Sequence, residues 1–125
     1  GVDFVLKCME RMDGGEIFVP KIPSVRIVDL AKAMAPDLPI KTIGIRPGEK
    51  LHEIMCPADD SHLTLEFDDY FIISPSIIFY SREMDFTENA IGEKGRLVAQ
   101  GFEYNSGTNK HFLDVSEIND YNNLD

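Results

Sequence analysis

The sequence predicts a small α/β domain in which short helices and strands are mixed. Its 125 residues suit one domain, and 43% of them are apolar, which is enough for a hydrophobic core. Apolar side chains repeat at helix spacing near both ends of the chain, and short strand-like runs lie between them. We expect a single domain over 1–125, made of a helix-strand-helix-strand-helix unit (1–57) and a hairpin, loop and terminal helix (58–125).

The first half of the chain predicts alternating helices and strands. The first helix has one apolar face, which includes Val2, Val5 and Leu6, and a pair of glycines ends it. Ser24 is a candidate N-cap for the second helix, and Pro36 ends that helix. In order, we expect a helix at 2–12, a strand at 16–20, a helix at 24–35, a strand at 40–45 and a helix at 49–56.

The second half predicts fewer helical residues. Alternating apolar residues at 63–67, a turn at Asp68-Asp69 and a return at 70–74 are typical of a β-hairpin. A third short apolar run occupies 77–80, and the polar stretch 81–95 has no period, which predicts a loop. A last helix is expected at 115–121.

Composition narrows the classes of function. The formal net charge of −10 repels a phosphate backbone, so we expect no nucleic-acid partner. A local anion site stays open, because Lys41, Arg46 and Lys50 lie close together and act over about one Debye length, roughly 8 Å. Cys8 and Cys56 form neither a disulfide framework nor a metal pattern. No apolar run approaches the roughly 20 residues of a membrane span, so we expect no membrane contact by this segment.

The most informative stretch is the string Arg-Pro-Gly-Glu-Lys-Leu-His-Glu at 46–53, between a predicted strand and a predicted helix. Arg46 can grip a phosphate with two charge-assisted bonds, and Glu49 can accept bonds from ribose hydroxyls. Spacing alone favours a plain turn with a glutamate that stabilises a helix dipole over such a ligand site. His52 and Glu53 invite an acid–base or zinc interpretation, but the string does not match His-Glu-x-x-His, and solvent-side roles suit both residues better.

No complete catalytic set is visible. The chain has no Gly-x-Gly-x-x-Gly fingerprint for a dinucleotide, and no tyrosine is followed four positions on by lysine. We therefore expect no catalytic residue, no metal ligand and no bound cofactor in this segment.

Several strings resemble one family. They are Gly-Gly-Glu-Ile-Phe-Val-Pro-Lys-Ile-Pro-Ser (14–24), Asp-Leu-Ala-Lys-Ala (29–33), Ile-Gly-Ile-Arg-Pro-Gly-Glu-Lys-Leu-His-Glu (43–53) and, more loosely, Tyr-Asn-Ser-Gly-Thr-Asn (104–109). Together they are similar to the UDP-N-acetylglucosamine 4,6-dehydratases, and most of all to the inverting type that also epimerises C5. These enzymes belong to the extended short-chain dehydrogenases/reductases.

The resemblance implies a fold and a site. The chain would be the C-terminal substrate-binding part of such an enzyme, without the N-terminal Rossmann domain that carries NADP and the catalytic residues. In the wider family this place binds UDP, with Arg46 on phosphate and Glu49 on ribose. Lys50, Arg26 and Lys41 are weaker candidates for added positive potential. The chain starts without Met inside a helical pattern, so we expect an excised piece with exposed apolar surface, at Val2, Val5, Leu6, Met9 and the run Ile77-Ile78-Phe79.

The resemblance also implies a role. The parent protein would be a cytoplasmic, NADP-dependent lyase for bacterial surface polysaccharide or flagellin glycan, and the piece alone would be inactive. Its partners would be a UDP-sugar and its own N-terminal domain; a homo-oligomer stays open. The alternative is a non-catalytic binding or oligomerisation module of a membrane-associated polysaccharide biosynthesis protein.

Overall fold

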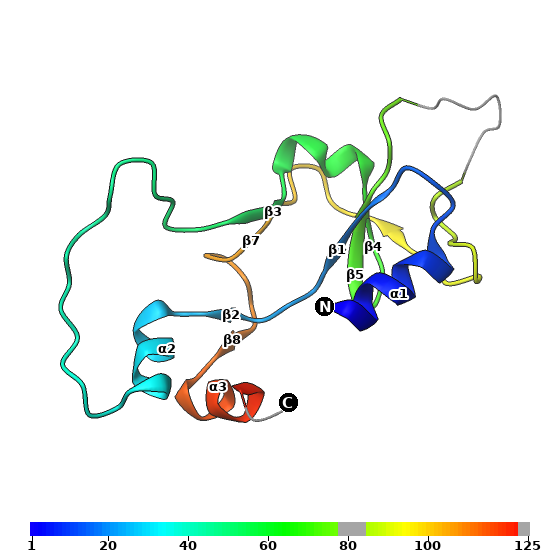
Figure 1. The fold of residues 1–125 in the computed structure, drawn as a ribbon. Coiled ribbons are helices and arrows are strands. Elements are labelled where there is room, and N and C mark those ends of the chain that lie inside the picture. The colour runs from blue at the N-terminus through cyan, green and yellow to red at the C-terminus, as the bar shows by residue number, and fades with distance from the viewer. Residues whose placement is uncertain (78–84, 123–125) are drawn as a thin grey trace. The chain divides into compact units, whose positions relative to one another are not determined.

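The computed structural model describes residues 1–77 and 85–122 and confirms a small mixed helix–strand fold (Figure 1). The chain forms two compact units. Unit 1 contains residues 1–21 and 54–104, and unit 2 contains 22–53 and 105–125. Each unit therefore combines residues from both halves of the sequence. A single substrate-binding domain over 1–125 stays a prediction.

The helices near both ends, the strand after the first helix and the hairpin lie where the sequence predicts them. In chain order the elements are α1 (Val2–Arg11), β1 (Ile17–Pro20), β2 (Ser24–Val25), α2 (Ile27–Met34), β3 (Ile54–Cys56), the 3-10 helix η1 (Ala58–Leu63), β4 (Thr64–Glu66), β5 (Tyr70–Ile73), β6 (Arg96–Leu97), β7 (Tyr104–Asn105), β8 (Phe112–Leu113) and α3 (Val115–Asn122).

Unit 1 is built on a four-stranded antiparallel sheet in the order β1-β5-β4-β6. The β4–β5 hairpin confirms the prediction, and the amide of Phe67 closes it by donating to the carbonyl of Tyr70 at 2.9 Å. All four residues of β5 are buried. Because successive side chains of a strand point to opposite faces, both faces of this sheet must be covered.

Two clusters of buried side chains cover the two faces. One cluster consists of Val19, Cys56, Phe71 and Ile73, with Leu63, Val98, Phe102 and Tyr104 packed against it. The other consists of Leu65, Phe67, Tyr70 and Ile72, with Phe4, Phe18 and Phe86 against it. Aromatic rings dominate the second cluster, where Phe67 and Tyr70 stack with centroids 4.8 Å apart. Burial raises the pKa of the Cys56 thiol to about 11, which suits a structural cysteine.

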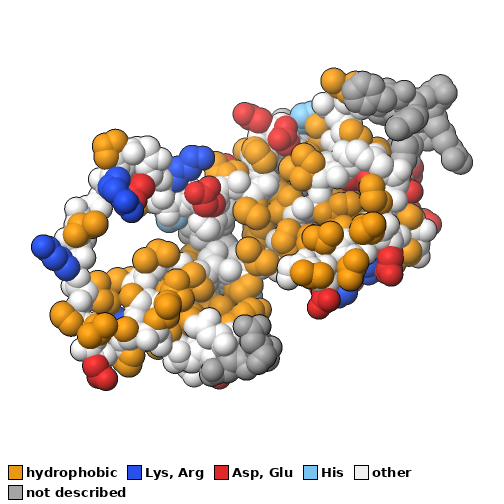
Figure 2. All heavy atoms as spheres, viewed as in Figure 1, with side chains coloured by type: hydrophobic (Ala, Val, Ile, Leu, Met, Phe, Trp, Pro, Cys, Tyr) orange, Lys and Arg blue, Asp and Glu red, His pale blue; other side chains and the backbone are white. Residues whose placement is uncertain are grey.

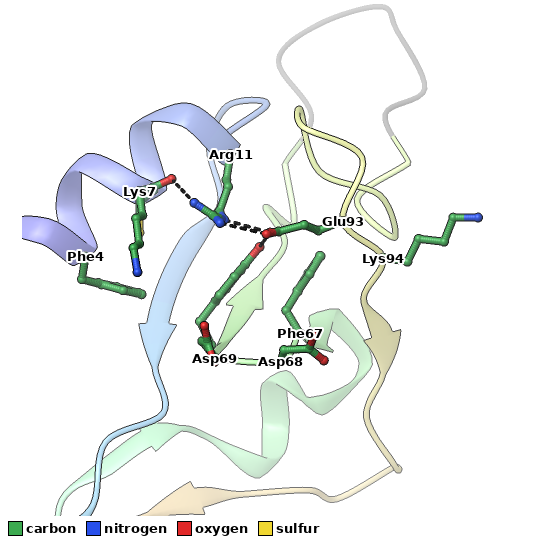
Figure 3. A pocket seen from close by; sticks show the side chains of 10 residues that line it. Phe4, Lys7, Arg11, Phe67, Asp68, Asp69, Glu93 and Lys94 are labelled. Atoms are coloured by element: carbon green, nitrogen blue, oxygen red, sulfur yellow. Dashed lines mark hydrogen bonds and ion pairs between the residues drawn. The ribbon is translucent and has the colours of Figure 1, made fainter.

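A polar network joins α1 to the segment around Glu93 in unit 1 (Figure 3). Arg11 donates from Nε and Nη2 to the two carboxylate oxygens of Glu93, both at 2.8 Å. The same carboxylate accepts from the Tyr70 hydroxyl at 3.2 Å and from Asn89 at 2.7 Å. The bonds from Arg11 lower the pKa of Glu93 to about 2, and burial raises the pKa of Tyr70 to about 12. The network therefore holds Glu93 ionised.

Unit 2 is held by a short parallel pair and two helices. β2 pairs with β8, and α2 contacts α3, whose Ile118 is buried. Asn109 donates to the carbonyl of Ile22 at 2.9 Å and to the hydroxyl of Ser24 at 3.1 Å. The prediction that Ser24 caps a helix is wrong. Ser24 is buried in β2, and the N-cap of α2 is Arg26, which makes no side-chain capping bond.

The predicted strand at 40–45 does not form. No described strand lies beside it, and Gly44 has φ +81°, outside the extended region. Ile43 and Ile45 are exposed. An isolated extended segment has no ladder to satisfy its backbone, so the alternation of apolar residues alone does not make it a strand.

The predicted helix at 49–56 is also wrong. Residues 49–53 are irregular with a bend at 51–52, and 54–56 form strand β3, which pairs with β7. Leu51 and Ile54, which a helix at 49–56 would place on its inner side, are 81% and 54% exposed. Residues 49–53 follow the turn at Gly48 and pack against no apolar surface among the described residues. A helix there would therefore bury none of its apolar side chains. Helix stability in proteins depends mostly on such packing.

Several short strand pairs were not predicted from the sequence. Two-residue strands such as β2, β6 and β8 are too brief to show a period. Within the predicted loop at 81–95, the described residues include an isolated bridge between Glu88 and Lys94. The apolar run at 77–80 lies outside the described residues from 78 on; Ile77 itself is exposed.

The outer face of α1 is apolar and open to solvent, as expected. Val2, Val5, Leu6 and Met9 are each more than half exposed. Hydrophobic side chains gather over α1 in the space-filling view (Figure 2). α1 contains no buried residue, although Phe4 packs edge-on against Tyr70 from its inner side.

We predict that acid weakens unit 1 through Glu93. A carboxyl whose folded pKa lies below its unfolded value stabilises the fold above the unfolded pKa, and this contribution disappears as pH falls from about 4.5 towards 2. Glu93→Gln should lower the urea midpoint at pH 7, and the difference from wild type should shrink by pH 3. Urea unfolding followed by circular dichroism at both pH values tests this. An equal difference at both would contradict the assignment.

We also predict that Gly95→Ala strongly destabilises unit 1. A Cβ at Gly95 would lie 2.5–2.9 Å from three ring carbons of Phe67, which is buried and stacked on Tyr70. Overpacking of this kind costs about 1–3 kcal/mol. Lys94→Ala, which shortens an exposed neighbour, is the control. Equal thermal midpoints for the two variants would show that the Phe67 ring moves freely.

Candidate functional site

Arg46-Pro47-Gly48-Glu49 forms a tight turn in unit 2. The amide of Glu49 donates to the carbonyl of Arg46 at 3.0 Å, and Gly48 has φ +84°. Proline in the second position and a glycine with positive φ in the third are the residues that a type II turn requires. The sequence therefore sets the local geometry of this motif without help from the rest of the fold.

The turn brings Arg46 and Glu49 together. The Nε of Arg46 donates to one carboxylate oxygen of Glu49 at 2.8 Å, and the amide of Arg46 donates to the other oxygen at 2.6 Å. The Arg46 side chain is 78% exposed and that of Glu49 is 40% exposed. Within the described residues, the terminal nitrogens Nη1 and Nη2 of Arg46 have no partner. The pair thus presents two free NH2 groups, with four N–H donors, to solvent beside a carboxylate.

A second turn anchors the chain just after this motif. The amide of Glu53 donates to the hydroxyl of Ser106 at 2.9 Å, and the amide of Ser106 donates back to the Glu53 carbonyl at 2.9 Å. A Cβ at Gly107 would come within 2.7 Å of the His52 ring, so that glycine allows close packing. The Asn105 side chain accepts from the amides of Gly107 and Thr108, both at 2.8 Å, which shapes this turn. His52 and Glu53 therefore serve as anchor points.

Lys41, Lys50 and Arg26, the weaker candidates, make no hydrogen bond or ion pair with the Arg46–Glu49 pair within the residues described. In the described part of the chain, neither Lys41 nor Lys50 makes an ion pair or side-chain bond, and both are exposed. Arg26 lies over the Phe112 ring at 5.8 Å from its centroid, so it packs against β8. Of these four cations, Arg46 alone forms an ion pair among the described residues.

The anchoring role of Ser106 and Gly107 was missed from the sequence. Their string had a signal, because Asn-Ser-Gly is turn chemistry, but nothing in it names the distant segment that the turn contacts.

Unit 1 contains a cavity of about 270 Å³ between α1, the β4–β5 turn and the segment at 93–94 (Figure 3). Phe4, Lys7 and Arg11 line it from α1, opposite Phe67 and Glu93. The Arg11–Glu93 pair at its wall is fully bonded within the protein. No residue predicted as a site lies there.

None of the helices within 1–77 and 85–122 combines the length and the apolar character needed to span a bilayer. Over the same ranges, no three His, Cys, Asp or Glu side chains cluster as metal ligands would.

Two proteins from Campylobacter jejuni are similar in sequence to nearly the whole chain. The chain is 58% identical over 118 residues to the "UDP-N-acetylglucosamine 4,6-dehydratase (inverting)" of one Campylobacter jejuni strain, which covers 94% of the chain and 35% of that protein. The same enzyme from a second strain gives 58% over 120 residues, or 96% of the chain and 36% of that protein. These matches confirm the predicted resemblance. The chain spans about a third of the length of these relatives.

More distant matches cover a similar share. The chain is 37% identical to an uncharacterised membrane protein of Methanocaldococcus jannaschii, over 68% of the chain and 32% of that protein. The X-ray structure of Pen from Bacillus thuringiensis superposes with a TM-score of 0.66 at 26% identity, over 93% of the chain and 33% of Pen. The sequence model of the family described as "Polysaccharide biosynthesis protein" matches residues 1–75, which is more than half of the chain. The chain therefore belongs to this polysaccharide biosynthesis protein family.

Proposed function

We propose that this chain is the nucleotide-sugar-binding part of a UDP-N-acetylglucosamine 4,6-dehydratase of the inverting type. The observation that carries the proposal is the 58% identity to two proteins of that name over at least 94% of the chain. The parent enzyme would remove water from UDP-N-acetylglucosamine to give a 4-keto-6-deoxy sugar. Epimerisation at C5, a cytoplasmic location and a place in surface polysaccharide or flagellin glycan synthesis belong to the same proposal. Free Cys8 and Cys56 suit a reducing compartment.

Arg46 is proposed to bind the diphosphate. Its Nε is held by Glu49, so Nη1 and Nη2 point the remaining donors of a planar fork outward. A guanidinium edge of this kind matches two phosphate oxygens. The high exposure of the side chain leaves room for such a ligand.

Glu49 is proposed to bind the ribose hydroxyls. An ionised carboxylate can accept about four hydrogen bonds, and Glu49 accepts two, one on each oxygen. One lone pair on each oxygen therefore remains for a sugar hydroxyl. The Arg46–Glu49 ion pair and the proposed contacts to phosphate and ribose can exist together. The turn would therefore be preorganised for the ligand.

The role of this chain would be orientation rather than chemistry. Binding energy from UDP, remote from the reacting carbons, would hold the sugar in place for catalytic groups elsewhere in the parent. The residues of this chain do not fit NADP, because the sequence has no glycine-rich dinucleotide turn. The NADP requirement and the catalytic residues are assigned to the part of the parent that this chain does not cover.

We predict that Arg46→Ala and Glu49→Ala each raise KM ten- to a hundredfold with little change in kcat. Each contact to a charged group is worth about 1.5–3 kcal/mol and changes little between ground and transition states. Because the two side chains touch, the double variant should cost less than the sum of the single ones. Arg46→Lys should recover only part of the affinity.

The measurement is steady-state kinetics in a chimera in which this chain replaces the matching third of the Campylobacter jejuni dehydratase. Arg96→Ala, an exposed arginine in unit 1, is the charge-matched control and should behave as wild type. Circular dichroism checks folding. Folded Arg46→Ala and Glu49→Ala variants with wild-type KM would place the nucleotide elsewhere.

We predict that the isolated chain shows no saturable binding of NADP. Without a glycine turn at a helix N-terminus, no set of backbone amides can surround its pyrophosphate. Titration of NADP into labelled chain, followed by amide chemical shifts, tests this. Micromolar binding to a defined patch would mean that a cofactor site has been overlooked.

A further inference from the structure

The Arg46–Glu49 turn has one near attachment and one distant attachment within unit 2. His52 lies three positions after Glu49, and an extended chain spans at most roughly 11 Å over that interval. On the other side, the cap of α2 at Ala35 lies eleven positions before Arg46, an interval that can span roughly 40 Å. Residues 39–45 make no backbone hydrogen bond to another described residue and run as an open loop (Figure 1). The place of the turn within unit 2 therefore depends mainly on what holds His52.

The turn at 105–109 holds this near end. The Ser106 hydroxyl accepts from the amide of Glu53 at 2.9 Å, and the Ser106 amide donates to the Glu53 carbonyl at 2.9 Å. Gly107 lies against the His52 ring so closely that an added Cβ would come within 2.7–2.8 Å of three ring atoms. The backbone at Gly107 does not need glycine, because its φ is not positive. The contact with the His52 ring is what excludes a side chain there.

The turn at 105–109 is itself fixed in unit 2. The Asn105 side chain accepts from the amides two and three positions further on, both at 2.8 Å, which sets the shape of the turn. Asn109 donates to the carbonyl of Ile22 at 2.9 Å and to the hydroxyl of Ser24 at 3.1 Å, which joins the turn to the start of β2. A continuous series of contacts therefore runs from β2 through this turn to the residues that follow the candidate site.

We propose that Ser106 and Gly107 are positioning residues for the nucleotide site, and that they hold the Arg46–Glu49 pair at one place in unit 2. The inference rests on the proposed function, because it takes this pair to bind UDP. A binding group on a loosely held segment must be ordered when the ligand binds, and that ordering lowers affinity. An anchor that orders the segment beforehand acts on substrate binding and not on the chemical step.

Steady-state kinetics in the Campylobacter jejuni chimera tests the inference. Ser106→Ala removes one neutral hydrogen bond and should raise KM about two- to tenfold with little change in kcat. Ser106→Thr keeps a hydroxyl and should recover most of the wild-type affinity. Thr108→Ala is the matched control, because it removes from the same turn an exposed hydroxyl that has no partner among the described residues. It should behave as wild type, and circular dichroism checks folding.

Two double variants separate positioning from a general loss of stability. In an Arg46→Ala background, Ser106→Ala should raise KM less than it does in wild type, because the contact that it positions is already absent. Gly107→Ala should raise KM by itself but have no further effect in a His52→Ala background, because the ring that the new Cβ meets is then gone. A purely structural weakening would instead add in both backgrounds.

Two results would overturn the inference and leave the proposed function standing. One is wild-type KM in folded Ser106→Ala and Gly107→Ala variants while Arg46→Ala raises KM. The turn would then have another support, such as pairing of 40–45 with the edge of β2 that is open among the described residues. The other is an effect of Ser106→Ala or Gly107→Ala that is undiminished in its double variant. Wild-type KM in Arg46→Ala and Glu49→Ala would refute the proposed function, and this inference with it.

Discussion

Burial of β5 on both faces is the constraint on which unit 1 depends. A strand with no exposed residue needs a neighbour at each edge and a layer on each side. β1 and β4 supply the edges, α1 covers one face through Phe4, and Phe102 and Tyr104 cover the other. β1 and β5 are about fifty residues apart in sequence, so this pairing closes a long loop, and residues 22–53 of that loop form part of unit 2.

Within its described residues, unit 2 has no strand that is buried on both faces, and these residues pack less closely. Its buried side chains are few, among them Ser24, Leu113 and Ile118, and its longest segment runs from 35 to 53 without helix or strand. The turn at Arg46 survives there because proline and glycine determine it locally. The string at 46–53, on which the predicted resemblance partly rests, therefore lies where tertiary support is weakest.

The parts that sequence predicts well are those whose signal is local. α1, α2, α3 and the β4–β5 hairpin each carry enough residues to show a period, and all four are present. The predictions of a strand at 40–45 and a helix at 49–56 are wrong. Hydrophobic periodicity shows only that a segment could present an apolar face, and these two segments have no apolar surface to pack against among the described residues. The β2–β8 pair and the Ser106 anchor join segments more than fifty residues apart, and no single-sequence pattern names such partners. For the site, proximity of Arg46 and Glu49 follows from the turn, whereas the supports of that turn do not.

Under the proposed binding role, the Arg46–Glu49 contact would order the site for its ligand rather than stabilise the fold. An exposed ion pair is worth only about 0.2–1 kcal/mol, so the contact adds little to folding. It nevertheless removes rotational freedom from a long side chain, which a ligand would otherwise have to order. Since the carboxylate bonds Nε and no described residue bonds Nη1 or Nη2, both terminal nitrogens would stay available to a phosphate. If the proposal holds, this weak contact would matter more for affinity than for stability, and the same two residues would be dispensable for the fold yet necessary for binding.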